Sequence, residues 1–219
     1  MSKPDPAAFI RTNTKILSPP LLPEIRLHLA EQSLPIWMKT EEELGESGLP
    51  PPYWAFAWPG GQALGRHLLD NPALVAGKPV LDLAAGCGMT AIAALKAGAA
   101  RAIGNDIDEF AGAAMGLNAA LNGVAIEVRL GDMLSGPPMP DHVILVGDLF
   151  YEKPLAAKVL AWLDACQLAG ATILTGDPQR TYFPKHRFTR VADYQVPVSR
   201  ELEDAELKPT AIWRLVPNP

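Results

Sequence analysis

The chain has 219 residues, 48% of them hydrophobic and 20% charged, which is typical of a globular protein and excludes a wholly disordered chain. With 19 basic and 24 acidic side chains the formal net charge is −5, which argues against nucleic-acid binding because phosphates are neutralised by clustered lysines and arginines. No apolar run approaches the roughly 20 residues that a membrane-spanning helix needs, so we expect no membrane partner.

The N-terminal part of the chain is rich in proline, which predicts a packed arm. Residues 24–34 place apolar side chains between polar ones, and a short helix or a strand fits this spacing equally well. Residues 60–69 carry leucines at helical spacing, and Asn71-Pro72 ends this helix because the residue before a proline avoids helical geometry. We therefore divide the chain into an arm over residues 1–59 and a main domain over residues 60–219.

From residue 79 onward, predicted strands alternate with predicted helices. The expected strands are residues 80–83, 101–104, 126–130, 143–146, 171–175, 188–194 and 210–216. The expected helices are residues 89–97, 108–122 and 154–169. This order predicts an α/β fold with a Rossmann-like, doubly wound, seven-stranded sheet that is mostly parallel and ends in an antiparallel pair.

A glycine-containing loop follows the first of these strands and precedes a helix, which is where nucleotide cofactors bind. Its small residues let a ligand approach the backbone, and the helix N-terminus offers free N–H groups. Gly86-x-Gly88-x-x-Ala91 matches the dinucleotide fingerprint, so an NAD(P)-dependent oxidoreductase is one interpretation. A tight turn without a ligand is another.

Asp82, at the end of the same strand, shifts the balance toward a different cofactor. A carboxylate there repels a pyrophosphate and attracts a cation, which favours S-adenosylmethionine with its ammonium and sulfonium groups. Asp106 ends the second strand, where a carboxylate can accept hydrogen bonds from ribose hydroxyls of either cofactor. Asp108 is expected to cap the next helix. Asp132 and Met133 follow the third strand, where they flank an adenine or simply form a loop.

Several segments together resemble one family of enzymes. They are PPYWAFAWPGGQALGRHLL (51–69), VLDLAAGCGMTAIAA (80–94), GNDID (104–108), GDLFY (147–151) and GDPQR (176–180). The chain is similar to the seven-β-strand, class I protein-lysine methyltransferases that carry Asp-x-x-Tyr after the fourth strand. Within them it most resembles the enzymes that methylate the electron transfer flavoprotein β-subunit, and their bacterial relatives. The family pattern has glycine where this chain has Ala84, and Gln179 is a second departure.

The resemblance implies roles for particular residues. Trp58 closes over the cofactor and shapes the substrate entrance, whereas Trp54 fits a core position better. The implied cofactor-binding residues are Trp58, Asp82, Ala84, Gly86, Gly88, Asp106, Ile107, Asp132 and Met133. The implied catalytic residues are Asp148, Phe150 and Tyr151, which line a channel for the incoming amine.

These three side chains suit methyl transfer to a lysine, whose ordinary pKa is about 10.4. Asp148 captures and orients the ammonium, Tyr151 hydrogen-bonds the nitrogen, and Phe150 offers a face that attracts cations. No dedicated general base is evident, and capping of a helix is the alternative role for Asp148. Nucleic-acid amine methyltransferases of this fold carry two prolines where this chain has Leu149-Phe150, which again argues against a nucleic-acid substrate.

The expected partner is therefore the electron transfer flavoprotein β-subunit. Another basic protein of the ribosomal type, a small amine, and a catalytically idle binding module are alternatives. We expect no metal, because the histidines are scattered in sequence, and we expect a monomer. Two cysteines are too few for a disulfide framework and suggest a reducing compartment. The scarcity of targeting features favours a bacterial-type cytoplasm or, in a eukaryote, the mitochondrial matrix.

Overall fold

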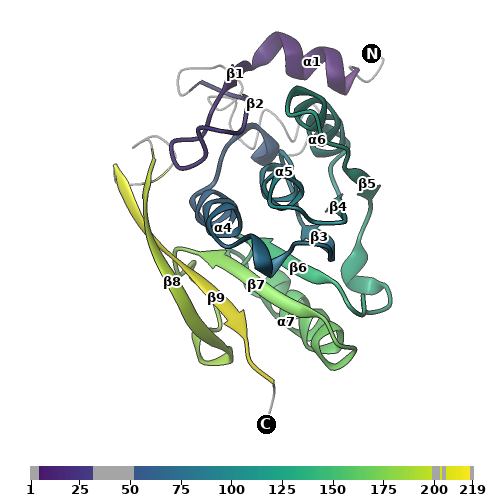
Figure 1. The fold of residues 1–219 in the computed structure, drawn as a ribbon, viewed down its shortest axis with the longest axis vertical. Helices are drawn as coiled ribbons and strands as arrows, with labels where there is room; N and C mark the ends of the chain where they lie inside the picture. The colour runs from purple at the N-terminus through teal and green to yellow at the C-terminus, as the bar shows by residue number, and fades with distance from the viewer. Residues whose placement is uncertain (1–4, 32–51, 199–202, 204–205, 218–219) are drawn as a thin grey trace.

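A seven-stranded mixed sheet forms the centre of the molecule (Figure 1). The computed structural model describes residues 5–31, 52–198, 203 and 206–217. The strands are β3 (Pro79–Leu83), β4 (Arg101–Asp106), β5 (Glu127–Leu130), β6 (Val143–Gly147), β7 (Thr172–Asp177), β8 (Phe188–Pro197) and β9 (Leu207–Leu215). Their spatial order is β5-β4-β3-β6-β7-β9-β8, and β9 runs antiparallel to both of its neighbours. The predicted mostly parallel sheet with an antiparallel final pair is confirmed.

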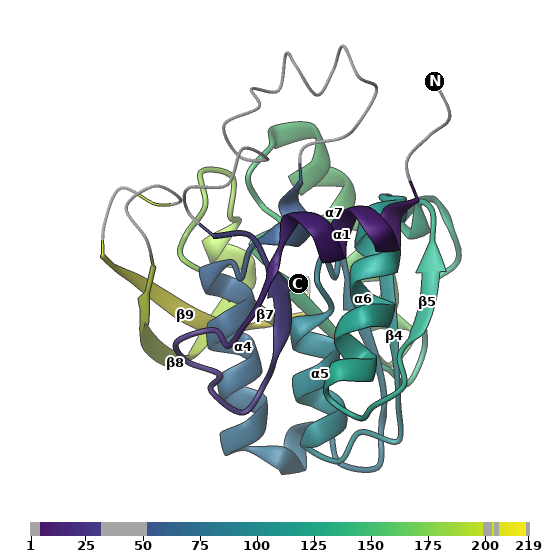
Figure 2. The ribbon, with the colours of Figure 1, turned by 90° about the horizontal axis from the view of Figure 1, so that it is seen from above.

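Helices cover both faces of this sheet (Figure 2). α4 (Pro59–Asp70), α5 (Met89–Lys96) and α6 (Glu109–Leu121) lie on one face, and α7 (Lys153–Leu168) lies on the other. Short 3₁₀ turns occupy Tyr53–Ala55, Pro72–Leu74, Met133–Ser135 and Lys185–Arg187. Apolar side chains of the central strands alternate between the two faces, so each helical layer has its own core.

Helix boundaries follow local chemistry that the sequence made visible. The Asp108 side chain accepts a hydrogen bond of 2.9 Å from the N–H of Phe110 and caps α6, as expected. α4 ends at Asp70, and its C-cap, Asn71, comes directly before Pro72. None of the helices in the described ranges has both the length and the apolarity that crossing a membrane requires.

The described part of the arm contains α1 (Pro6–Asn13), β1 (Lys15–Leu17) and β2 (Leu27–Leu29). The ambiguous segment 24–34 thus holds a strand, β2, which pairs antiparallel with β1. The ring of Phe9 contacts Phe110 of α6 edge to face at 5.3 Å, which fixes α1 against the main domain. Such three-residue strands carry almost no periodic signal, which is why only their tertiary contacts reveal them. Residues 1–4 and 32–51 of the arm lie outside the described ranges.

The strand order reverses at β3, because β4 lies on one side of it and β6 on the other. In open sheets of this kind, ligands bind outside the carboxyl ends of the strands at such a reversal. The residues that follow β3, β4, β6 and β7 therefore meet at one edge of the sheet. This is where the candidate site lies.

Candidate active site

A pocket of about 490 Å³ opens at the carboxyl ends of β3, β4 and β6. This volume falls within the roughly 300–1,000 Å³ of sites for small molecules and cofactors. Ten of the residues predicted from sequence line it: Trp58, Asp82, Ala84, Gly86, Asp106, Ile107, Asp132, Met133, Asp148 and Tyr151. Gly88 and Phe150 do not line it.

The loop after β3 takes its shape from left-handed backbone at three positions. Ala84, Gly86 and Gly88 have φ values of 54°, 53° and 75°. Glycine adopts this geometry freely, whereas a residue with a side chain pays on the order of 1–3 kcal/mol for it, so Ala84 is a strained position. Gly88 is the N-cap of α5, and a Cβ there would lie 3.0 Å from Cγ of Met115. Gly88 therefore serves the turn and its packing, with no surface in the pocket.

Asp82 is almost wholly buried at the base of this pocket, with 2% of its surface exposed. Its Oδ2 accepts a hydrogen bond of 2.9 Å from the N–H of Ala91, in the first turn of α5. Burial raises the pKa of Asp82 to about 8, and the nearby negative charge of Asp106 adds to the shift. A ligand that brings a positive charge to this position relieves the cost of the buried carboxylate.

Asp106 lies on the same side of the pocket at the end of β4. Its Oδ2 accepts from the N–H of Gly86 at 3.0 Å, and its Oδ1 accepts from the N–H groups of Ile107 and Asp108 at 2.8 and 3.1 Å. Burial raises its pKa despite these bonds. Two carboxylates with raised pKa values in one pocket suit a ligand that carries a cation and hydroxyl groups, and they disfavour a pyrophosphate.

Asp132 and Met133 occupy the turn after β5, at the rim of the pocket. Asp132 accepts from the N–H of Leu134 at 3.0 Å and pairs with Lys158 of α7 at 2.6 Å. The hydrogen bond from Lys158 lowers the pKa of Asp132. This pairing holds the turn in place, and contact with an adenine stays a prediction.

Asp148 follows β6 in a left-handed conformation, with φ of 53°, and is 9% exposed. Its Oδ2 accepts from the N–H of Gly61 at 3.2 Å, in the first turn of α4. Asp148 thus does cap a helix, but the helix is α4, which lies far from it in the sequence. The approach is close: a Cβ on Gly60 would lie 2.4 Å from Oδ2 of Asp148 and 2.1 Å from the carbonyl oxygen of Gly176. Burial raises the pKa of Asp148 although nearby cationic and N–H groups oppose it.

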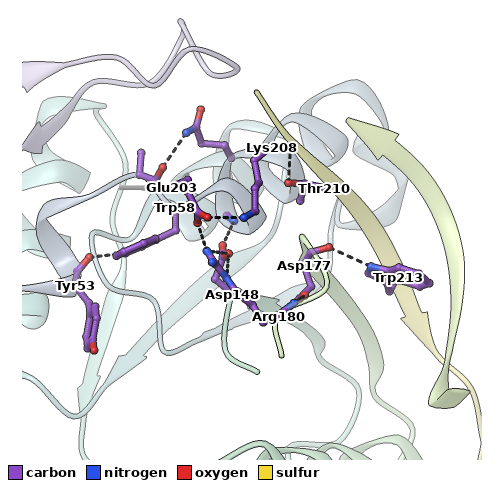
Figure 3. A network of polar contacts seen from close by, with 12 residues as sticks. Tyr53, Trp58, Asp148, Asp177, Arg180, Glu203, Lys208, Thr210 and Trp213 are labelled. Carbon is purple, nitrogen blue, oxygen red and sulfur yellow. Dashed lines mark hydrogen bonds and ion pairs between the residues drawn. The ribbon is translucent and has the colours of Figure 1, made fainter. Parts of the chain in front are cut away.

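Arg180 is the functional candidate that sequence reasoning missed. Its Nε and one Nη lie 3.0 and 2.7 Å from Oδ1 of Asp148. The same Nη lies 2.5 Å from Glu203, which in turn pairs with Lys208 at 2.7 Å (Figure 3). The available signal was positional, because β7 lies parallel beside β6, and the GDPQR segment after β7 must then end next to GDLFY.

Aromatic rings form the outer wall of the pocket. The indole N–H of Trp58 donates to the carbonyl of Tyr53 at 2.9 Å, and the ring centroids of Tyr53 and Tyr151 are 5.9 Å apart. Tyr151 is 46% exposed. Partial burial raises the pKa of its phenol, which therefore stays protonated at neutral pH. Trp54 stacks on Phe110 in the core, as expected, and also contributes to the wall.

Phe150 has a different place from the one expected. It is wholly buried, and its ring meets Phe183 and Phe188 edge to face at 5.3 and 6.0 Å. Leu149, its neighbour, lines the pocket instead. The aromatic face that was expected to attract the amine is therefore covered by protein. A sequence cannot tell which residue of a strand-end turn points to the core, because the left-handed Asp148 breaks the alternation of the strand.

The remaining reactive side chains give no sign of separate chemistry. Among the described residues no group of histidine, cysteine and acidic side chains could hold a metal ion. Burial raises the pKa of Cys87 to about 12, so its thiol stays protonated and is a poor nucleophile.

The sheet order is that of the class I methyltransferase fold, which solved structures share. Ribosomal protein L11 methylase from Lactobacillus delbrueckii subsp. bulgaricus has a TM-score of 0.52 and 21% identity, covering 74% of this chain and 81% of that one. The tRNA (uracil-54, C5)-methyltransferase of Pyrococcus abyssi, in complex with S-adenosyl-L-homocysteine, has a TM-score of 0.51 and 17% identity, covering 69% and 38%.

Sequence relatives narrow the class to a family. Residues 66–145 match the family described as ribosomal protein L11 methyltransferase (PrmA). The electron transfer flavoprotein beta subunit lysine methyltransferase of Rattus norvegicus is 39% identical over an alignment of 217 positions, which covers 96% of this chain and 84% of the rat protein. The chain is a methyltransferase and belongs to the family of electron transfer flavoprotein β-subunit lysine methyltransferases.

Proposed function

We propose that this protein transfers a methyl group from S-adenosylmethionine to lysine side chains of the electron transfer flavoprotein β-subunit. The observation that carries the proposal is that Asp82 and Asp148 line one continuous pocket of about 490 Å³. A cofactor at Asp82 and an amine at Asp148 therefore share one space. The 39% identity to the rat lysine methyltransferase supports the choice of substrate.

The donor set of the pocket fits this cofactor. S-adenosylmethionine, when bound, supplies a methyl group on a positively charged sulfur that is already a good leaving group. Asp82 would hold its ammonium, and Asp106 would accept hydrogen bonds from its ribose hydroxyls. Ile107 and Met133 offer apolar surface on the side of the pocket where the adenine is expected. Among the described residues that line the pocket, Arg180 is the only one with a basic side chain. Its ion pairs with Asp148 and Glu203 leave it poorly placed to bind a pyrophosphate.

The acceptor side of the pocket suits a lysine. Asp148 attracts the ammonium, and the hydroxyl of Tyr151 can hydrogen-bond the nitrogen. Tyr53, Trp58 and Tyr151 form an aromatic wall, which excludes water and lowers the pKa of an amine that enters. Alignment of the nitrogen with the methyl carbon then supplies most of the catalysis, because the donor needs no further activation.

The experiment that tests the proposal is intact-mass spectrometry of purified electron transfer flavoprotein after incubation with the enzyme and S-adenosylmethionine. We expect mass increments of one methyl group on the β-subunit, which are lost with the Asp148→Asn variant. Binding of S-adenosylhomocysteine without any mass increment would overturn the proposed substrate and favour another basic protein or a small amine as the methyl acceptor. Absence of binding would overturn the cofactor. The monomeric state and the compartment stay predictions.

A further inference from the structure

Asp148 already has partners before any substrate arrives. Its Oδ1 accepts from two nitrogens of Arg180 at 3.0 and 2.7 Å, and its Oδ2 faces the N–H of Gly61 at 3.2 Å. Both carboxylate oxygens are thus engaged by positively polarised groups. The negative charge of Asp148 is therefore partly offset before an amine enters the pocket.

This compensation matters because the amine must react without its proton. The lysine nitrogen gives its proton to water, bonds the methyl carbon with the lone pair thus freed, and the sulfur keeps the electrons of the broken bond. An uncompensated carboxylate at the acceptor position stabilises the ammonium and raises the pKa of the lysine. A guanidinium that shares the carboxylate weakens this effect while the carboxylate can still orient the nitrogen.

We propose that Arg180 is a positioning residue that fixes the Asp148 carboxylate and offsets its negative charge, so that the lysine amine reaches the methyl donor without its proton. The inference rests on the proposed function. It assigns a role to a residue that touches Asp148 and borders the acceptor end of the pocket.

Arg180 is itself held from several directions. Its backbone N–H donates to Oδ1 of Asp177 at 2.7 Å, and its guanidinium lies over the ring of Trp58 at 5.8 Å. Glu203 anchors the Nη that also reaches Asp148, and Lys208 anchors Glu203 from β9 (Figure 3). The side chain of Arg180 is 19% exposed. The guanidinium is thus held by Asp148, Glu203 and Trp58, and these contacts keep it beside Asp148 when an ammonium arrives.

The other titratable groups around Asp148 in the pocket are acidic. Asp177 is wholly buried at the end of β7, and burial raises its pKa to about 7. Asp82 and Asp106 line the cofactor end of the same pocket, and Tyr151 borders its acceptor end. Because these groups are acidic, Arg180 is the positive charge that bears directly on Asp148, and its removal leaves no replacement among the described pocket-lining residues.

The test compares Arg180→Gln with Arg180→Lys in the methylation of electron transfer flavoprotein over a range of pH. For Arg180→Gln we expect kcat to fall at least ~10-fold at neutral pH and its acidic limb to move up by about one pH unit, which is a tenfold change in proton affinity. Loss of Arg180 makes either the amine or Asp148 hold its proton more tightly, and both move the limb in this direction. Arg180→Lys keeps the charge, so its limb stays near that of the wild type.

Glu203→Gln is the matched control within the same network. It removes a negative charge that competes for Arg180, so we expect no alkaline shift of the limb. Affinity for S-adenosylhomocysteine should stay within about threefold of wild type in all three variants. An active wild type with an unshifted limb in Arg180→Gln overturns the inference. A wild type that does not methylate the flavoprotein overturns the proposed function instead.

A substrate-free measurement tests the charge coupling separately. Because burial raises the folded-state pKa of Asp148, its contribution to stability is lost as pH rises through that pKa, and removing Arg180 raises the pKa further. The Tm deficit of Arg180→Gln relative to wild type should therefore grow as pH rises above the ordinary pKa of an aspartate, about 3.9. In an Asp148→Asn background the pH dependence of the deficit should be smaller, because only Asp177 and Glu203 are then left as acidic groups coupled to Arg180. A deficit that is equal at every pH, or that persists unchanged in that background, overturns the coupling.

Discussion

Asp82 and Asp148 both follow buried strands and border the same pocket, yet their surroundings differ. One oxygen of Asp82 accepts from the N–H of Ala91, and no basic side chain is paired with it in the described structure. Asp148 is paired with Arg180. The first carboxylate is thus suited to bind a cation tightly, and the second is suited to orient a nitrogen without holding its proton.

Substitution of Asp82 tests its part in cofactor binding. We expect Asp82→Asn to lower the affinity for S-adenosylhomocysteine at least ~10-fold, because the loss of one charge-assisted hydrogen bond costs about 1.5–3 kcal/mol. Asp132→Asn is the matched control, and its loss should be smaller because Asp132 is paired with Lys158 at the exposed rim. Calorimetric titration measures both. Equal losses would contradict the role given to Asp82.

Binding of the cofactor should depend on pH through the same residue. The pKa of Asp82 is raised to about 8, so its carboxyl is largely protonated at neutral pH. A bound ammonium favours the ionised form, and binding below about pH 8 should therefore release a proton and tighten as pH rises toward that value. Calorimetry in two buffers of different ionisation enthalpy measures the proton directly. Binding heats that are identical in both buffers would argue that Asp82 does not pair with the ligand.

Substitution of Asp148 separates binding from turnover. We expect Asp148→Asn to bind S-adenosylhomocysteine nearly as well as wild type and to lose at least ~10²-fold in kcat, because alignment of the amine depends on it. Paired binding and single-turnover assays provide the measurement. A parallel loss of affinity and turnover would place Asp148 with the cofactor instead of the acceptor.

At the scale of elements, the N-terminus of α4 is pressed onto the ends of β6 and β7. Gly60 makes this possible because a side chain there would meet Asp148 and Gly176, whereas a side chain on Gly61 would point at Met89 of α5. The contact brings α4 N–H groups to the Asp148 carboxylate and carries Trp58, which precedes the helix, to the pocket wall. Residues 58–61 (WPGG) thus join α4 to the strand ends that carry the site.

Alanine at two helical glycines tests this view. Gly60→Ala should lower the free energy of unfolding by about 1–3 kcal/mol, the usual cost of overpacking, and should reduce activity by displacing Asp148. Gly116→Ala, in α6 with no atom within 4 Å of the added Cβ, should raise it by about 0.5–1 kcal/mol. Urea denaturation of both variants supplies the comparison. A Gly60→Ala protein as stable and active as wild type would show that the approach is not needed.

For the whole molecule, Phe150 connects the acceptor site to the core between the sheet and α7. Its ring belongs to a cluster that includes Phe183, Phe188 and Trp213, so the terminal strands β8 and β9 support the turn that carries Asp148. The antiparallel pair has a functional consequence, because it also supplies Lys208, the anchor of Glu203.

Phe150→Ala should therefore lower mainly the stability of the protein, and Tyr151→Phe should lower mainly its methylation rate. Emptying the fully buried position of Phe150 should cost about 3–5 kcal/mol of stability. Removing the hydroxyl of the half-exposed Tyr151 should leave stability within about 0.5 kcal/mol and lower the methylation rate. Thermal melting beside a rate assay measures both effects. A stable Phe150→Ala protein that has lost only turnover would restore the catalytic role expected for that ring.

The sequence by itself determined the order of strands and helices, the glycine loop and the acidic strand ends at Asp82, Asp106 and Asp148. These are local patterns, since periodicity, caps and turn residues act over a few positions. It did not determine the pairing of β1 with β2, the burial of Phe150 or the ion pair between Arg180 and Asp148. Such contacts join residues far apart in the chain, and only the packing of β6 beside β7 with α4 across them decides which side chains meet.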